Sequence, residues 1–145
     1  DLDGVTTCIE EGTDSDGDSI ADAWEYEQLA ADGQPADLTV LTGSGDSDGD
    51  GESDLDEYFA DTNPFDATDF LRITSFTPKI ALGEADLTWA TWSARRVYSV
   101  KSSTDLQTWT TELSGLYTDT GTVVKGSPLP AKMFFQVVSG VPLCP

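Results

Sequence analysis

Residues 14–25 read DSDGDSIADAWE and residues 46–57 read DSDGDGESDLDE, so one spacing of acidic residues occurs twice. In both copies positions 1, 3, 5 and 9 are Asp and position 12 is Glu. A twelve-residue calcium loop uses side chains at these positions, a backbone carbonyl at position 7, and both carboxylate oxygens of the final Glu. The spacing therefore predicts two calcium-binding loops.

The predicted ligands follow from this numbering, with the residue at position 7 contributing its backbone carbonyl. In the first loop they are Asp14, Asp16, Asp18, Ile20, Asp22 and Glu25. In the second loop they are Asp46, Asp48, Asp50, Glu52, Asp54 and Glu57. Asp1, Asp3 and Glu10 fit positions 3, 5 and 12 of a truncated third repeat, so we expect two or more Ca²⁺ ions.

Other cations fit this pattern less well. Magnesium prefers a smaller octahedral shell and keeps several waters, which favours calcium for an oxygen-rich loop. The chain has no His and its two cysteines lie far apart, which argues against a typical zinc or copper site. The alternative is that both stretches are solvated acidic linkers. The repetition of the full pattern favours coordinated loops.

Charge divides the sequence near residue 69. Residues 1–69 contain 22 acidic residues and no Lys or Arg, whereas residues 70–145 contain five acids and seven bases. Self-repulsion opposes collapse of the acidic part unless cations join it. A pI near 4.1 argues against nucleic acid or an anionic membrane as partner. No apolar run approaches the roughly 20 residues that span a bilayer, so we expect no membrane insertion.

The hydrophobic pattern changes at the same place. Apolar residues at helical spacing follow both loops, and we expect the first helix to end near Gly33 and the second before Pro64. From residue 70 onward a period of two predicts six short antiparallel strands: 70–76, 86–92, 97–103, 109–113, 121–126 and 133–140. The predicted inward residues are Trp89, Val97, Phe135 and Val137.

These patterns predict an α+β protein in two parts. Residues 1–69 would form a calcium-loop and short-helix segment, and residues 70–145 an antiparallel β-sandwich. We also predict a disulfide between Cys8 and Cys144, which would join the two ends of the chain. Two unrelated thiols, or a bond to a cysteine outside this sequence, are the alternatives.

The acidic loops resemble the thrombospondin type 3-like calcium repeats of secreted bacterial proteins and are similar to dockerin and EF-hand-like loops. The sequence departs from these patterns at Ser19, where a turn Gly is usual, and at position 8, occupied by Ala21 and Ser53. The stretch DTNPFDATD (61–69) matches the segment that follows such helices. The resemblance makes Asp61, Asn63 and Asp66 further ligand candidates or turn caps.

The second half resembles a fibronectin III-like module found at the C-terminal end of large secreted bacterial proteins. The matching stretches are LTW (87–89), VYSVKSSTDLQTW (97–109) and MFFQVV (133–138). The resemblance implies a β-sandwich and an extracellular or cell-surface location. It implies no activity.

The sequence offers little for catalysis. No His is present for a nucleophilic triad, and the clustered acids are explained as calcium ligands, so we expect no enzyme. We expect a structural or adhesion module, with copies of itself or other surface proteins as partners. The alternative is an accessory carbohydrate-binding module of a secreted polysaccharide-degrading enzyme. A row of exposed Trp, for example Trp92 and Trp109, would favour polysaccharide as the partner.

Overall fold

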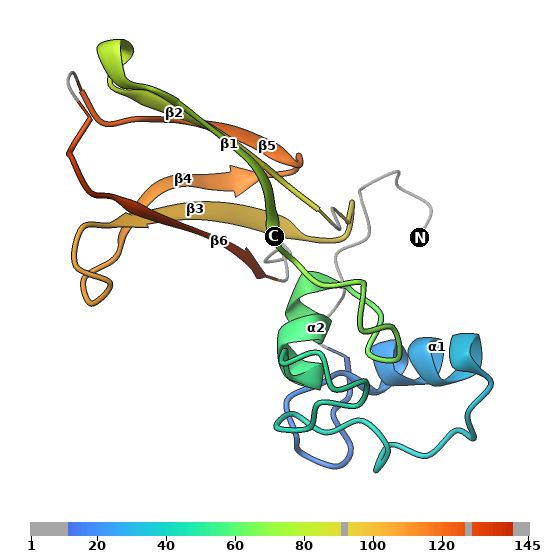
Figure 1. Cartoon of the computed structure of the whole chain (residues 1–145). Coiled ribbons are helices and arrows are strands. Elements are labelled where there is room, and N and C mark those ends of the chain that lie inside the picture. Colours follow the sequence, from blue (N-terminus) through green and yellow to red (C-terminus); the bar gives the residue numbers. More distant parts are fainter. Residues whose placement is uncertain (1–11, 91–92, 127–128, 141–145) are drawn as a thin grey trace, which may run out of the picture.

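The computed structural model describes residues 12–90, 93–126 and 129–140 (Figure 1). Two helices come first, α1 (Asp22–Asp32) and α2 (Asp54–Ala60). The strands are β1 (Ile73–Lys79), β2 (Glu84–Trp89), β3 (Val97–Ser103), β4 (Thr110–Leu116), β5 (Thr120–Val124) and β6 (Phe134–Gly140). A single 3₁₀ turn, η1 (Ile80–Leu82), connects β1 to β2.

The predicted α+β class is wrong, because the described chain is mostly β. Its six strands belong to two antiparallel three-stranded sheets, while its α-helices are limited to 11 and seven residues. Both predicted helices are present, but each is short because the acidic loops and the connector take up most of the first 69 residues, where short Asp side chains bond to the backbone of their own loop. The boundary at residue 69 stays a prediction.

The two sheets have the orders β1-β2-β5 and β4-β3-β6 and enclose one hydrophobic core. Figure 1 shows them as two layers. Trp89 is buried, and Phe135 and Val137 pack against the core as predicted. The inward prediction for Val97 is wrong. Its neighbour Tyr98 is fully buried instead, because in β3 the side chains at even-numbered positions point into the core.

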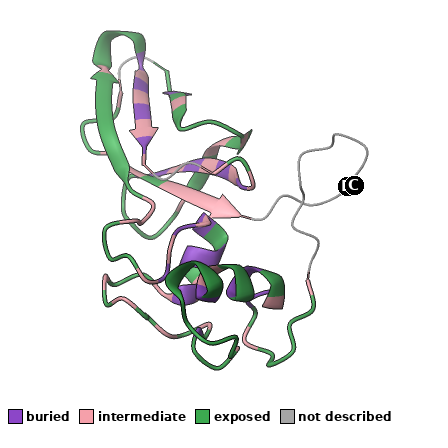
Figure 2. Cartoon of the chain, turned by 90° about the vertical axis from the view of Figure 1, so that its right-hand side faces the viewer, coloured by how far each residue is buried: buried purple, intermediate pink, exposed green. Residues whose placement is uncertain are grey.

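A second core cluster lies among the acidic loops and helices. This cluster contains buried residues from the first loop, from both helices and from the connector between the loops (residues 34–45). They are Ile20, Trp24, Tyr58 and Leu41. As predicted, α1 ends near Gly33, which follows its last residue and adopts the left-handed conformation of a helix C-cap. Figure 2 shows this buried centre surrounded by exposed loops. Among the described residues, no helix has the length and apolar character needed to cross a membrane.

Candidate metal centre

Each predicted loop brings its first three Asp carboxylates together. In each group, one oxygen of every member lies within 4.8 Å of an oxygen of the others. The two groups are Asp14, Asp16 and Asp18, and Asp46, Asp48 and Asp50. The predicted ligands at positions 1, 3 and 5 of each loop therefore form an acidic triad that could hold a metal ion.

The Asp at position 1 folds each loop around itself. Asp14 accepts hydrogen bonds from the amides of Gly17 at 2.7 Å and Ser19 at 3.1 Å. Asp46 makes the equivalent pair with Gly49 and Gly51, at the same two distances. This repeated geometry explains why the local sequence alone fixes the loop shape, since short Asp side chains reach their own backbone.

Ser19 occupies a strained position in the first loop. Its φ is 81°, in the left-handed region that favours Gly, and Gly51 occupies the equivalent position in the second loop with φ 104°. A non-Gly residue pays a steric cost of roughly 1 kcal/mol in this conformation. The departure from the usual turn Gly, visible in the sequence, is therefore accommodated without changing the loop.

The Asp at position 9 accepts hydrogen bonds from the early part of each loop and so stabilises the loop. Asp22 accepts hydrogen bonds from the Ser15 amide at 2.7 Å and the Ser15 hydroxyl at 2.6 Å, which lower its pKa. The buried Asp54 accepts from the amides of Ser47 and Thr42, both at 2.9 Å. Both predicted ligands thus lie at their loops with their oxygens engaged by protein donors, a bracing role that sequence spacing alone does not reveal.

Position 7 also lies within each loop. The amide of Ile20 donates to Asp18 at 2.9 Å, and the amide of Glu52 donates to Asp50 at 2.7 Å. These bonds hold the backbone at position 7 against the position 5 carboxylate. The carbonyl oxygens of Ile20 and Glu52 remain predicted ligands.

The Glu residues at position 12 are the most unusual groups of the site. Glu25 is fully buried, and among the described residues neither of its carboxylate oxygens has a hydrogen-bond partner. Glu57 is 1% exposed; its Oε1 accepts from the Thr62 hydroxyl at 3.2 Å, whereas Oε2 has no partner within the described chain. Buried carboxylates without partners are costly unless a cation compensates them.

Burial and neighbouring charge act together on these two carboxyls. Burial, followed by the charges of Asp18 and Asp16, raises the pKa of Glu25 to about 8. Burial, followed by the charge of Asp48, raises the pKa of Glu57 to about 8. The negative charges of the Asp residues in its own loop therefore act on each Glu. One further oxygen on each of Asp18, Asp48 and Asp50 is also buried without a described partner.

The connector between the loops packs closely against the first loop. A Cβ atom on Gly43 would lie 2.2 Å from the carbonyl oxygen of Asp18, so only Gly allows the connector to approach the first loop. Leu41, two residues earlier, is completely buried in the cluster with Ile20 and Trp24. The loops are therefore parts of one packed body.

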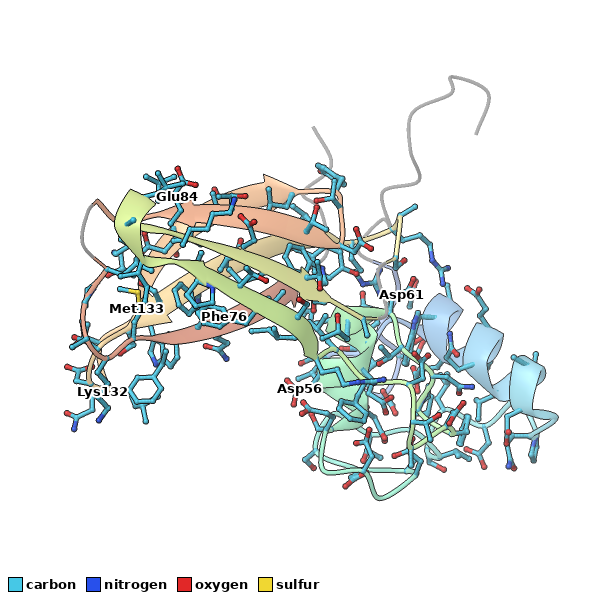
Figure 3. All side chains as sticks on the ribbon, turned by 45° about the horizontal axis from the view of Figure 1, so that its top comes forward. Asp56, Asp61, Phe76, Glu84, Lys132 and Met133 are labelled. Carbon is cyan, nitrogen blue, oxygen red and sulfur yellow. The ribbon has the colours of Figure 1, made fainter. Side chains whose placement is uncertain are left out.

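A polar junction connects these loops to the sheets. Asp61 follows α2, and its carboxylate receives hydrogen bonds from the Ser93 hydroxyl at 2.5 Å, from Arg95 Nη2 at 2.8 Å and from the Trp24 indole at 3.1 Å. Burial alone would raise the pKa of Asp61, but the hydrogen bonds from Ser93 and Arg95 and the charge of Arg96 hold it below its usual value. Figure 3 shows Asp61 where the helical region meets the sheets.

Arg96 completes the junction from the strand side. Its side chain is fully buried, and Nε donates to the carbonyls of Tyr58 at 3.1 Å and Phe59 at 3.0 Å, near the end of α2. Its guanidinium also lies 5.4 Å from the centre of the Tyr58 ring. Sequence reasoning missed this residue, although Arg95 and Arg96 are the only adjacent basic residues in the chain.

The further candidates of residues 61–69 make turn contacts. The Asn63 side chain accepts from the Phe65 amide at 3.0 Å, and Asp66 accepts from the Thr68 amide at 3.0 Å. Both contacts fit the turn-cap interpretation, and Asp61 belongs to the junction. Neither acidic triad includes any of the three.

Several predictions fall outside the described residues. They concern Cys8 and Cys144, the truncated repeat with Asp1, Asp3 and Glu10, and Trp92. For the other tryptophans, Trp24 and Trp89 are buried and Trp109 is half-buried. The described chain therefore presents no row of exposed Trp that would favour the carbohydrate alternative.

Comparison with family models, curated proteins and solved structures finds no match. The resemblances to thrombospondin type 3-like repeats and to a fibronectin III-like module stay predictions.

Proposed function

We propose that the chain binds one calcium ion in each acidic loop and acts as a structural or adhesion module at or outside the cell surface. Calcium replaces the missing positive charge in the acidic segment. The bound ions hold the loops and helices rigid, and the junction around Asp61 and Arg96 transmits that rigidity to the sheets.

One observation carries this proposal. Glu25 is fully buried within the field of the Asp14, Asp16 and Asp18 triad, and both of its oxygens lack a described hydrogen-bond partner. A carboxylate in that situation requires a cation or a proton. Calcium supplies the compensation and accepts many oxygens at once, including two from one Glu. Glu57 repeats the arrangement in the second loop with Oε2.

The contacts of the two position-12 residues support a structural role. Glu25 is adjacent to Trp24, whose indole donates to Asp61, and Glu57 is adjacent to Tyr58, whose carbonyl receives Arg96. Each proposed calcium ligand at position 12 is thus next in sequence to a residue that takes part in the junction. Fixing Glu25 and Glu57 therefore restrains the contacts between the loops and the sheets.

Calorimetric titration of the metal-free chain with calcium tests the proposal. We expect Glu25→Gln and Glu57→Gln each to weaken one site by at least about tenfold, because a charged ligand that supplies two oxygens is lost. Asp32→Asn and Asp37→Asn remove the same charge outside the loops and serve as controls. Equal losses in all four variants would contradict coordinated sites and indicate a diffuse ion atmosphere.

The metal-free chain is expected to lose stability as pH rises. The raised pKa values of about 8 mean that folded Glu25 and Glu57 bind protons more tightly than the unfolded chain does. The free energy of unfolding should therefore fall as pH rises from about 4.5 to about 8, the range between the unfolded and folded pKa values. Denaturant unfolding in excess chelator measures this trend. With saturating calcium the trend should disappear; its persistence would contradict ligation by these carboxylates.

A further inference from the structure

In the described part of the chain, the side of the sheets between β1 and β6 is open. Within the described chain β1 pairs only with β2, and β6 pairs only with β3. Phe76 stands opposite Leu87 and Ile73 opposite Trp89, so both β1 residues share the core-facing side. Leu87 and Trp89 are 1% and 3% exposed, whereas Phe76 and Ile73 are 47% and 36% exposed. The described residues therefore leave the core without a cover along this edge.

A hollow of about 400 Å³ lies on the open side next to α2. It is lined by residues 136–139 of β6 and by residues 70–73, where the chain enters β1. Successive residues of a strand point to opposite faces, so a hollow lined by four in a row runs along the backbone edge. The edge of β6 thus borders this hollow opposite the chain that enters β1, and β1 and β6 each have a pairing edge that no described strand uses.

A second hollow of about 280 Å³ lies farther along the open side. The rings of Phe76 and Phe135, whose centres are 5.3 Å apart, both line it, together with Ile80 and Met133. In Figure 3, Met133, Phe76 and Asp56 follow one another along this side of the molecule. The lining is apolar at this end, while Glu52 and Asp56 line the hollow next to α2.

We propose that the open side receives an extended strand from another polypeptide. Backbone pairing with β6 would provide the affinity, and apolar side chains at alternate positions would fill the two hollows. A Lys or Arg at the strand end nearest α2 would meet Glu52 and Asp56, neither of which has a salt bridge within the described residues. Arg72 lines the same hollow, but its guanidinium is held by the carbonyls of Thr68 and Phe70.

Charge also favours a basic partner. The chain has a formal net charge of −20, so its field attracts a cationic segment and repels an acidic one. A second copy of this chain would bring the same negative charge. The occupant inferred here is therefore a different polypeptide, with an uncharged alternating strand that ends in a basic residue.

A labelled nine-residue peptide of alternating Val and Thr with one terminal Lys provides the probe. In calcium-containing buffer we expect saturable binding by fluorescence polarisation. Amides of residues 134–140 that face away from β3 should exchange with solvent at least about tenfold more slowly in the complex. A peptide with Pro in place of its central Thr cannot complete the pairing and should bind at least about tenfold more weakly.

Three variants locate the peptide on the open side. Phe76→Asp places a charge among the apolar positions and should weaken binding at least about tenfold, while Val124→Asp on β5, itself 66% exposed, should leave binding unchanged. Asp56→Lys should reverse the preference, so that a Glu-ended peptide binds better than the Lys-ended one. Unfolding curves for each variant verify that the fold is retained.

Several results would overturn the proposal. They are equal binding of the Pro peptide, equal effects of Phe76→Asp and Val124→Asp, or absence of binding by the Lys-ended peptide. Protection of the outward β6 amides in dilute chain alone would show that its own residues fill the side. Concentration-dependent dimerisation, measured by light scattering and abolished by Phe76→Asp, would identify a second copy as the occupant.

Discussion

Arg96→Met is expected to lower the free energy of unfolding by about 3–5 kcal/mol, the range for removing one partner of a buried charged network. Arg96 is fully buried and donates to the last carbonyls of α2. Its guanidinium also lies 3.5 Å from Asp61. Met fills the volume but leaves the Tyr58 and Phe59 carbonyls and the Asp61 carboxylate with fewer donors in a buried site.

Chemical denaturation of Arg96→Met, Arg96→Lys and Lys132→Met separates geometry from charge. Arg96→Lys keeps the charge but loses the planar set of donors that reaches two carbonyls, so we expect it to be destabilised as well. Lys132 is exposed, and Lys132→Met should change stability by no more than about 0.5 kcal/mol. Equal stability of Arg96→Met and Lys132→Met would show that the junction does not hold the two regions together.

Removing calcium is expected to cost about 5 kcal/mol of stability. A ligand that binds only the native state stabilises it by RT ln(1 + [L]/Kd), or about 2.7 kcal/mol per site at a hundredfold excess over Kd. Two sites at that saturation give the expected total. Without the ions, only a proton can compensate each of the buried carboxyls of Glu25 and Glu57 beside its Asp triad. Melting temperature should fall by at least about 10 °C in excess chelator.

Thermal unfolding followed by Trp fluorescence and by circular dichroism measures this loss. Trp24 lies in the core cluster beside the loops, so its emission should shift when calcium is removed. Adding calcium back should restore the melting temperature at lower concentrations than adding magnesium. An unchanged melting temperature in excess chelator, measured at constant ionic strength, would contradict the calcium proposal.

The local parts of the candidate site were predictable because short-range chemistry decides them. Asp14 and Asp46 bond to amides three and five residues away, so sequence spacing alone places the triads. The six strands lie within a few residues of their predicted ranges, because side-chain alternation is local too. In β3, however, alternation from Val97 and alternation from Val100 place opposite sets of side chains inward. The sequence does not decide between them, and packing buries Tyr98 and Val100.

Long-range contacts were not predictable in the same way. Arg96 and Tyr58 are 38 residues apart, and Asp61 and Arg95 are 34 apart, so no periodicity connects them. The bracing of Asp54 by Thr42 likewise depends on how the connector folds back over the second loop. The α+β expectation was wrong although both predicted helices are present, because these helices span only 11 and seven residues beside six strands.

Native mass spectrometry of the calcium-loaded chain tests the central claim most directly, because it counts bound ions. We expect at least two calcium ions on the unaltered chain, and one fewer on Glu25→Gln and on Glu57→Gln at calcium concentrations near the Kd. Asp32→Asn should retain the full number. A chain that carries no tightly bound calcium, or the same number of ions in all four proteins, would contradict coordination by the two loops.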